Sequence, residues 1–566
     1  MTVDRKTAVR ALREIATLLE IAGDNQHRVR AFANASRAVD RLEGDLERMI
    51  AGGTLLEVKG LGRGTVAVLE DLAAGRQPEV LTKTLAAVPE GVRDFLRVPG
   101  LGPQKVRALW QELGVTSLGE LEYACRENRL VELPGFGATT QNRILEGVRF
   151  ARQAGERRLM NEAQRTAEDL RESLRSASGV VDVIVAGEVR RCCETVGSFD
   201  LVVVAGTEEA AGRAVETCVP GSSRGPDGIW TGSSTAGLPV NLWGVGPADA
   251  GVTQLWATGS GKHLEELVAR ARAGGMSLRP DGLWRGDERV PCPDEAAVYE
   301  ALGCTWVPPE LREGEGETER AVAGKMPSLV SMADLMGALH NHTTDSDGAA
   351  TVEDMARAAG ELGWRYFGVA DHSPVAVYAH GVDGDRLRDQ WRRIDAFNQT
   401  GTGPRIVKGL EADILTDGAL DIPEGCEDGL EYVVASVHSN FRLTEEQQTE
   451  RLVRAVANPA CRVLGHPTGR LLLARPGYSV DLDQVLGACA EHGVAVEINA
   501  SPYRLDLDWR WARRALELGL KLIVNPDAHS PEGLADVGWG LAVARKAGAT
   551  AADLVNCAPI EEFLLE

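Results

Sequence analysis

Nine side chains between positions 340 and 529 belong to the types that bind divalent metals. They are six histidines, two aspartates and one glutamate: His340, His342, Asp347, His372, Glu411, His438, His466, Asp527 and His529. Neutral imidazole nitrogens bind zinc, iron or manganese, and carboxylates lower the net charge of a site and can bridge two ions. A bridging Glu411 would bring two metals within about 4 Å, the two-metal geometry used to hydrolyse phosphate esters. The set therefore predicts two or three divalent ions and phosphoesterase chemistry.

Short β-favouring apolar runs lead into these residues and must position them. The segments are ALHNHTTDSDG, YFGVADHS, IVKGLEADI, YVVASVHS, CRVLGHPTGR and KLIVNPDAHS. Helical patterns lie between them, for example at 352–362 and 506–519. Strands that alternate with helices predict a parallel sheet, which we expect to close into a distorted (β/α) barrel. The C-terminal ends of barrel strands converge on one face, so residues far apart in the sequence can share one metal cluster.

This region resembles the polymerase-and-histidinol-phosphatase (PHP) superfamily of metallo-phosphoesterases, because every expected ligand position is filled. The resemblance implies one metal at His340, His342, Glu411 and Asp527, a second at Glu411, His438 and His466, and a third at Asp347, His372 and His529. It implies Mn²⁺, Zn²⁺ or Fe²⁺ as the ions and gives catalytic roles to His340, His342, Glu411, His438, Asp527 and His529. Arg470 and Arg475 follow His466 and are candidates for holding the substrate phosphate, with surface charge as the alternative. Glu497 and Asn499 lie at the end of another strand, and we expect them to support the metal ligands through hydrogen bonds.

Composition limits the remaining possibilities. A chain of 566 residues predicts three or four domains. It contains no 18-residue apolar run and no signal-peptide pattern, so we expect a cytoplasmic protein without a membrane partner, and a monomer by default. Its ten cysteines form no CxxC pair and are expected to be reduced. The formal net charge is −22, yet residues 1–150 balance 21 Lys and Arg against 20 Asp and Glu.

The near-neutral N-terminal part carries an internal repeat. It reads VKGLGRGTVAVL at 58–69, VPGLGPQKVRAL at 98–109 and LPGFGATTQNRIL at 133–145. The glycines allow positive φ and a close approach of phosphate, and the helix that follows offers free N–H groups to it. These repeats resemble helix-hairpin-helix motifs, which bind DNA phosphates without reading the sequence; the alternative is glycines that only serve packing. The expected DNA-binding residues are Lys59, Gly60, Gly62, Arg63, Gly100, Gly102, Lys105, Gly135 and Gly137.

The middle segment VIVAGEVRRCCETVGSFDLVVVAG at 183–206 resembles the palm of family X DNA polymerases. The family pattern is Gly-Ser, Arg-Arg, then Glu-Thr-Val-Gly-Asp-x-Asp, and a residual site of Gly187, Arg190 and Asp200 matches it. Three positions depart from the pattern: Glu188 replaces the serine, Ser198 replaces the first aspartate, and Asn241 replaces the third. Nucleotidyl transfer needs clustered carboxylates for two Mg²⁺ ions, and neutral Ser198 and Asn241 bind Mg²⁺ weakly.

The hairpins, palm and PHP region together resemble bacterial family X DNA polymerases over nearly the whole chain. The expected architecture is a small helical DNA-binding domain at 1–90, a fingers-like hairpin domain at 91–155, an α+β palm and thumb-like region at 156–315, a linker at 316–332 and the barrel at 333–566. The resemblance implies a DNA-repair 3′-5′ exonuclease acting on gapped, nicked or 3′-end DNA. The three departures in the palm predict that polymerase activity is weak or lost. Two alternatives stay open: an active gap-filling polymerase, and a DNA-binding scaffold fused to a small-molecule phosphoesterase.

Overall fold

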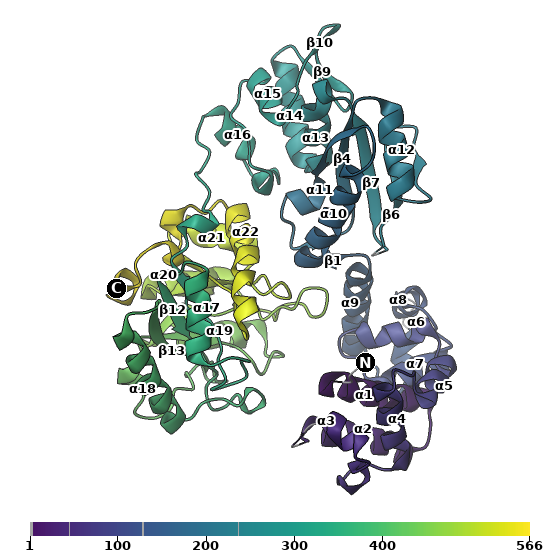
Figure 1. The fold of residues 1–566 in the computed structure, drawn as a ribbon, viewed down its shortest axis with the longest axis vertical. Coiled ribbons are helices and arrows are strands. Elements are labelled where there is room, and N and C mark those ends of the chain that lie inside the picture. Colours follow the sequence, from purple (N-terminus) through teal and green to yellow (C-terminus); the bar gives the residue numbers. More distant parts are fainter. Residues whose placement is uncertain (1–3, 43, 45, 127–128, 236, 566) are drawn as a thin grey trace. The chain divides into compact units, whose positions relative to one another are not determined.

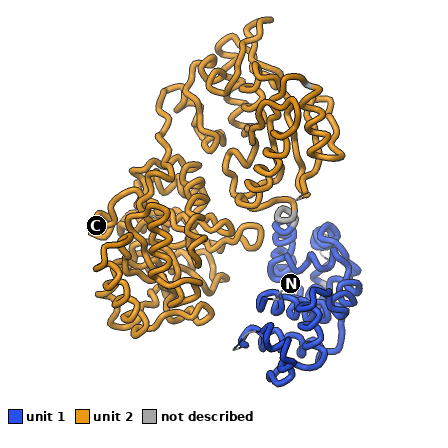
Figure 2. Tube along the Cα trace, in the orientation of Figure 1, with its two compact units in different colours: residues 1–155 blue, residues 156–566 orange. Residues whose placement is uncertain are grey.

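Two compact units make up the chain, residues 1–155 and residues 156–566 (Figure 2). The computed structural model describes residues 4–42, 44, 46–126, 129–235 and 237–565 (Figure 1). It confirms the expected fold class, with helical hairpin domains, a polymerase-like α+β region and a C-terminal parallel barrel. In the described part of the chain no helix is both long and apolar enough to cross a membrane. All ten cysteines are free thiols.

The first unit is entirely helical in its described residues. Its α-helices are α1 (Arg5–Ala22), α2 (Gln26–Asp40), α3 (Leu46–Ala51), α4 (Arg63–Ala73), α5 (Glu79–Ala87), α6 (Glu90–Arg93), α7 (Pro103–Leu113), α8 (Leu118–Arg126) and α9 (Ala138–Gly155). Two apolar cores hold it together. One joins α1, α2 and α4, and the other joins the end of α1 to α7, α8 and α9. The two cores share α1, so the first hairpin packs against the same helix as the second and third.

The second unit begins with a five-stranded sheet. Its strand order is β2 (Val180–Val185), β4 (Phe199–Ala205), β7 (Pro239–Val245), β6 (Trp230–Ser233) and β5 (Ser223–Arg224). Helices α10 (Met160–Arg175) and α12 (Glu208–Cys218) cover one face, and α13 (Ala250–Thr258) covers the other. A smaller core follows, built on α13, α14 (Gly261–Ala273), α15 (Glu295–Ala301) and the antiparallel strands β8 (Ser277–Arg279), β9 (Gly282–Arg285) and β10 (Glu288–Val290).

The C-terminal part is a nearly closed barrel of seven parallel strands. In order they are β11 (Gly337–Ala338), β12 (Tyr366–Val369), β13 (Arg405–Asp413), β14 (Tyr432–Ser436), β15 (Cys461–Leu464), β16 (Ala495–Asn499) and β17 (Leu522–Asn525). A parallel bridge between Asn341 and Ala528 joins the ends of the first and last strands. The outer helices are α17 (Val352–Glu361), α18 (Gly384–Thr400), α19 (Glu445–Val456), α20 (Leu482–His492), α21 (Trp509–Glu517) and α22 (Val537–Ala547), in Figure 1 coloured from teal to yellow.

Tyr432 fills the barrel interior beneath the strand ends. Tyr432 is buried, and a Cβ at Gly409 would lie 2.2 Å from its ring, so only glycine fits beside it. The Tyr432 hydroxyl donates hydrogen bonds to the carbonyls of Leu339 and Val369, the latter at 2.7 Å. Those carbonyls lie at the ends of β11 and β12, just before residues predicted to bind metal. One hydroxyl therefore joins two of the strand ends that carry the candidate site.

We expect Tyr432→Phe to lower the free energy of unfolding of the barrel by about 1–3 kcal/mol, because two buried carbonyls lose a partner. Urea unfolding measures this change, with hydrogen exchange of the barrel strands as the readout. Tyr503→Phe is the matched control, since Tyr503 is 60% exposed. Equal stability of the two variants would contradict the role assigned to the hydroxyl.

Candidate metal centre

All nine predicted ligands meet at the C-terminal ends of the barrel strands. Each lies on a strand or in the loop directly after it, as parallel packing requires. Four overlapping groups have ligand atoms within 4.8 Å of one another: His342, Asp347, His372 and His529; His340, His466 and Asp527; His340, His342 and Glu411; and His372, Glu411 and His438. Their membership differs from the three sets that the resemblance implied, since His342 also joins the Asp347 group and His466 lies with His340 and Asp527.

Glu411 is the centre of the cluster. This carboxylate is 1% exposed and faces five imidazoles. Its Oε1 lies 3.2 Å from His340 Nε2, 3.2 Å from His438 Nε2 and 3.1 Å from His466 Nε2. Its Oε2 lies 2.8 Å from His372 Nδ1 and 3.7 Å from His342 Nε2. Both oxygens thus point at potential ligands, which is the arrangement a carboxylate shared by two cations needs.

Unsatisfied polar atoms in the cluster fit divalent metals. Buried nitrogens or oxygens without a hydrogen-bond partner occur on His340, His342, His372, His466 and Glu411. A buried polar atom that lacks a partner is costly, so an ion that uses these lone pairs would remove the penalty. Burial, reinforced by the nearby charge of His372, lowers the pKa of His342 to about 4. That imidazole is therefore neutral near pH 7, the form that donates to a metal.

A second set of carboxylates orients the imidazoles from behind. Glu497 Oε2 accepts from His340 Nδ1 at 2.7 Å, and its other oxygen accepts the backbone N–H of His466 at 3.1 Å. Asp413 Oδ1 lies 3.3 Å from His438 Nδ1. Asn499 Nδ2 donates to Asp527 Oδ2 at 3.0 Å. Such partners fix the ring orientation and tautomer of a metal-binding histidine, as was expected for Glu497 and Asn499.

Asp371 and Asp413 were missed by the sequence analysis. Asp371 accepts from the Thr343 backbone at 2.8 Å, from the Thr343 hydroxyl at 2.7 Å and from Ser346, so it holds the loop that carries Asp347. Asp413 could have been found, because side chains two apart on a strand share a face and Glu411 lies on the same strand. The role of Asp371 has no such signal, since its partners Thr343, Ser346 and Gln390 lie 19 to 28 positions away in the chain.

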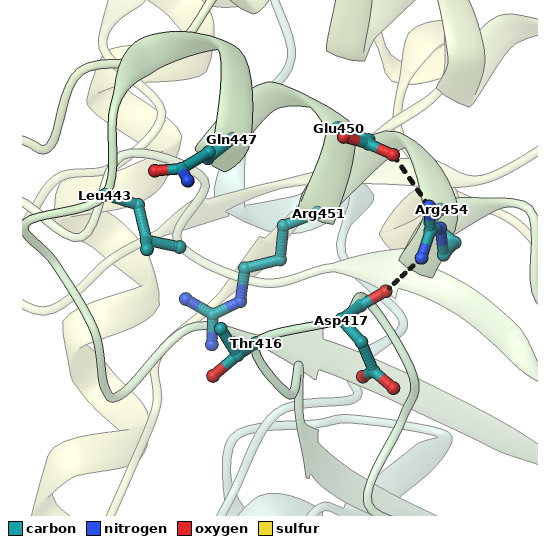
Figure 3. A pocket seen from close by; sticks show the side chains of 7 residues that line it. All are labelled: Thr416, Asp417, Leu443, Gln447, Glu450, Arg451 and Arg454. Atoms are coloured by element: carbon teal, nitrogen blue, oxygen red, sulfur yellow. Dashed lines mark hydrogen bonds and ion pairs between the residues drawn. The ribbon is translucent and has the colours of Figure 1, made fainter.

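A small polar pocket beside the cluster serves the scaffold. Its lining residues are Thr416, Asp417, Leu443, Gln447, Glu450, Arg451 and Arg454 (Figure 3). Arg451 is 2% exposed and donates to the carbonyls of Leu415 at 2.9 Å, Ser439 at 3.0 Å and Ile414. These carbonyls belong to the loops after β13 and β14. The guanidinium therefore ties together the loops next to Glu411 and His438.

The two arginines proposed to bind phosphate have different surroundings. Arg470 Nη2 donates to Glu194 Oε1 at 2.5 Å, and its Nε donates to the carbonyl of Arg504 at 2.9 Å. Arg475 lies over the ring of Phe441, with 4.4 Å between the guanidinium carbon and the ring centroid. In the described residues Arg475 forms no ion pair, whereas Arg470 is committed to one, which argues against a phosphate-binding role for Arg470.

In the palm site, the Asp200 carboxylate has two neutral side chains as its hydrogen-bond partners. Strands β4 and β7 place Asp200 directly opposite Asn241, whose Nδ2 donates to Asp200 Oδ1 at 2.9 Å. Ser198 Oγ donates to the other oxygen at 3.2 Å. Burial raises the pKa of Asp200. Among the described residues, no group of three potential metal ligands includes Asp200.

The remaining palm residues are committed to internal contacts. Glu188 accepts from Arg157 Nη2 at 2.9 Å and from the Gly197 N–H at 2.6 Å. Arg190 makes a bidentate pair with buried Glu295, both bonds 2.7 Å long. A Cβ at Gly187 would lie 2.3 Å from Asp200 Oδ2, so this glycine lets the loop pass against the carboxylate. Glu188 and Arg190 are thus engaged within the palm itself.

The three glycine hairpins expose backbone ahead of helix N-termini. The first glycine of each has positive φ, namely 103° at Gly60, 87° at Gly100 and 84° at Gly135. Helices α4, α7 and α9 begin within three residues of them. At Gly100 and Gly135 a Cβ would meet nothing within 4 Å. Exposed backbone of this kind, ahead of a helix N-terminus, suits a phosphate. Lys105 of the second hairpin lies over Phe136 of the third, with 5.7 Å between Nζ and the ring centroid.

Comparisons with known proteins find similar families for separate parts of the chain. Family models match as a helix-hairpin-helix domain at residues 4–77, a SAM-like helix-hairpin-helix tandem at 92–149, a DNA polymerase beta thumb at 253–313 and a PHP domain at 338–501. The DNA polymerase/3′-5′ exonuclease PolX of Bacillus subtilis (strain 168) is 30% identical, covering 99% of this chain and 98% of the relative. A probable phosphatase of Thermoanaerobacter sp. (strain X514) is 31% identical over 242 residues, covering 40% of this chain and 93% of that protein.

Proposed function

This chain belongs to the family of bacterial DNA polymerase/3′-5′ exonuclease PolX proteins, and on that premise we propose that it trims DNA from 3′ ends with the metal centre of its barrel. The observation that carries the proposal is Glu411 and the five imidazoles around it. The palm, with Asp200 between Ser198 and Asn241, extends primers poorly or not at all.

The reaction is hydrolysis of the last phosphodiester. Water adds to phosphorus, the P–O3′ bond breaks, and the leaving 3′ oxygen takes a proton to release a nucleoside 5′-monophosphate and a shortened strand. Divalent ions such as Mn²⁺, Zn²⁺ or Fe²⁺ would polarise the ester and offset the charge that develops on it. His340, His342, His438 and His466 would hold these ions as neutral donors, together with Glu411 and Asp527. Glu497 and Asp413 keep two of the rings in orientation.

The hairpin unit binds the DNA through its phosphates. Gly60, Gly100 and Gly135 present backbone to phosphates without a basic surface, which agrees with the near-neutral charge of residues 1–150. Binding through phosphates is independent of sequence and suits ends, nicks and gaps in DNA of any composition. A second candidate function is hydrolysis of small phosphate esters, which the likeness of the barrel to a probable phosphatase favours.

We expect the protein with Mn²⁺ to convert a 5′-labelled oligonucleotide into a ladder of shorter products. His340→Ala removes an imidazole that faces Glu411 and Asp527 and should slow the reaction by at least about 100-fold, since even partners behind metal ligands contribute 10–100-fold. The control is His492→Ala, at the exposed end of α20. If DNA stays intact while p-nitrophenyl phosphate is hydrolysed, the small-ester function replaces the exonuclease.

We expect template-directed incorporation to be at least about 1000-fold slower than that of the Bacillus subtilis relative, because two carboxylate positions hold neutral side chains. Primer extension on gapped DNA with Mg²⁺ or Mn²⁺ measures it. The assay uses the His340→Ala background, so that trimming cannot hide extension. Incorporation at a rate comparable to that of the relative would refute the loss of polymerase activity.

A further inference from the structure

The rim of the metal centre carries an exposed apolar loop that the proposed mechanism does not use. The loop follows His372, and its Val375, Val377 and Tyr378 are 51%, 79% and 67% exposed. The strand before it, β12, is fully buried. Apolar side chains that face solvent next to a reaction centre favour contact with a substrate.

Tyr378 lies against the ligands while most of its surface stays open. Its ring centroid is 5.9 Å from that of His372 and 6.3 Å from that of His438, at interplanar angles of 59° and 71°. The ring therefore stands at the entrance of the cluster, with part of its surface available to another planar group. A nucleobase stacks on such a ring whatever its identity.

Arg504 brings a positive charge to the same centre. Its Nε lies 3.8 Å from Asp527 Oδ2, and its side chain is 22% exposed. The backbone around it is anchored, because Arg470 Nε donates to the Arg504 carbonyl at 2.9 Å. The contact with Asp527 is too long for a hydrogen bond, so the guanidinium keeps donors for a further anion.

Arg475 adds a second guanidinium nearby. One of its nitrogens donates to the Gly469 carbonyl at 2.8 Å, and its buried Nε has no partner. Burial, with a contribution from the charge of Arg504, lowers the pKa of Arg475. Two arginines whose charges repel each other, one of which has a buried donor without a partner, favour an anion such as a phosphate.

We propose that this rim is a nucleotide subsite: Arg504, with Arg475, binds the phosphate of the terminal nucleotide, and Tyr378 stacks on its base. The inference rests on the proposed exonuclease function and names the part of the substrate that the barrel recognises. Selectivity for a nucleotide over a simple phosphate ester then comes from Tyr378, whereas Arg504 acts on any phosphate diester.

Two chromogenic esters with one leaving group separate these roles. They are thymidine 5′-(p-nitrophenyl phosphate) and methyl p-nitrophenyl phosphate, assayed with Mn²⁺ under steady-state conditions. We expect Tyr378→Ala to raise KM for the thymidine ester about 5-fold or more and to leave KM for the methyl ester unchanged. Tyr378→Phe keeps the ring and should behave as the wild type. An equal effect of Tyr378→Ala on both esters, or none on either, overturns the stacking role.

We expect Arg504→Gln to raise KM for both esters about 10-fold or more, because a charged donor to the phosphate is lost. Arg392→Gln, on the exposed face of α18, is the matched control. If Arg504 only positions Asp527, Arg504→Gln lowers the metal content and kcat and leaves KM unchanged. That result would overturn the phosphate role. Both esters lack a DNA strand, so these results stand apart from the oligonucleotide ladder that tests the exonuclease.

Discussion

One buried carboxylate imposes the arrangement of the barrel's active face. Glu411 is 1% exposed and faces five imidazoles, which requires five strand ends to meet at one point. A charge in such a position is tolerated only with close partners of opposite charge. Burial would raise the pKa of Glu411, yet its interaction with the His438 and His340 imidazoles holds that pKa well below its ordinary value. The bonds of Tyr432, Arg451 and Glu497 are best understood as the scaffold that keeps these strand ends together.

Internal contacts hold the palm together around Asp200. Its sheet keeps the frame that places Asp200 opposite Asn241, and Arg190 keeps a partner in Glu295. Burial would raise the pKa of Glu295, but Arg312 and Arg190 hold it at about 2, so the pair stays charged over the physiological range. The palm also contacts the barrel, through Glu194 with Arg470 and through Arg191 and Glu313 with Lys546. These contacts join the palm to the barrel within one compact unit.

Much of this architecture could be predicted from the sequence, because its signals are local. Histidines at the ends of β-favouring runs predicted the barrel, and the structure brings all nine predicted ligands together. The glycine repeats predicted the hairpins. The surroundings of single side chains could not be predicted, because they depend on distant residues. Arg470 follows His466 by four positions, yet its guanidinium is engaged by Glu194, 276 positions away. Arg504 and Tyr378 carry no motif and are recognised only through the cluster that they border.

Anomalous scattering from crystals grown with Mn²⁺ tests the central claim most directly. We propose that divalent metal binds at Glu411 and not beside Asp200. The account predicts anomalous peaks at the manganese edge among His340, Glu411 and Asp527, and no peak beside Asp200. A peak of comparable height beside Asp200, or a barrel cluster without any peak, would contradict it.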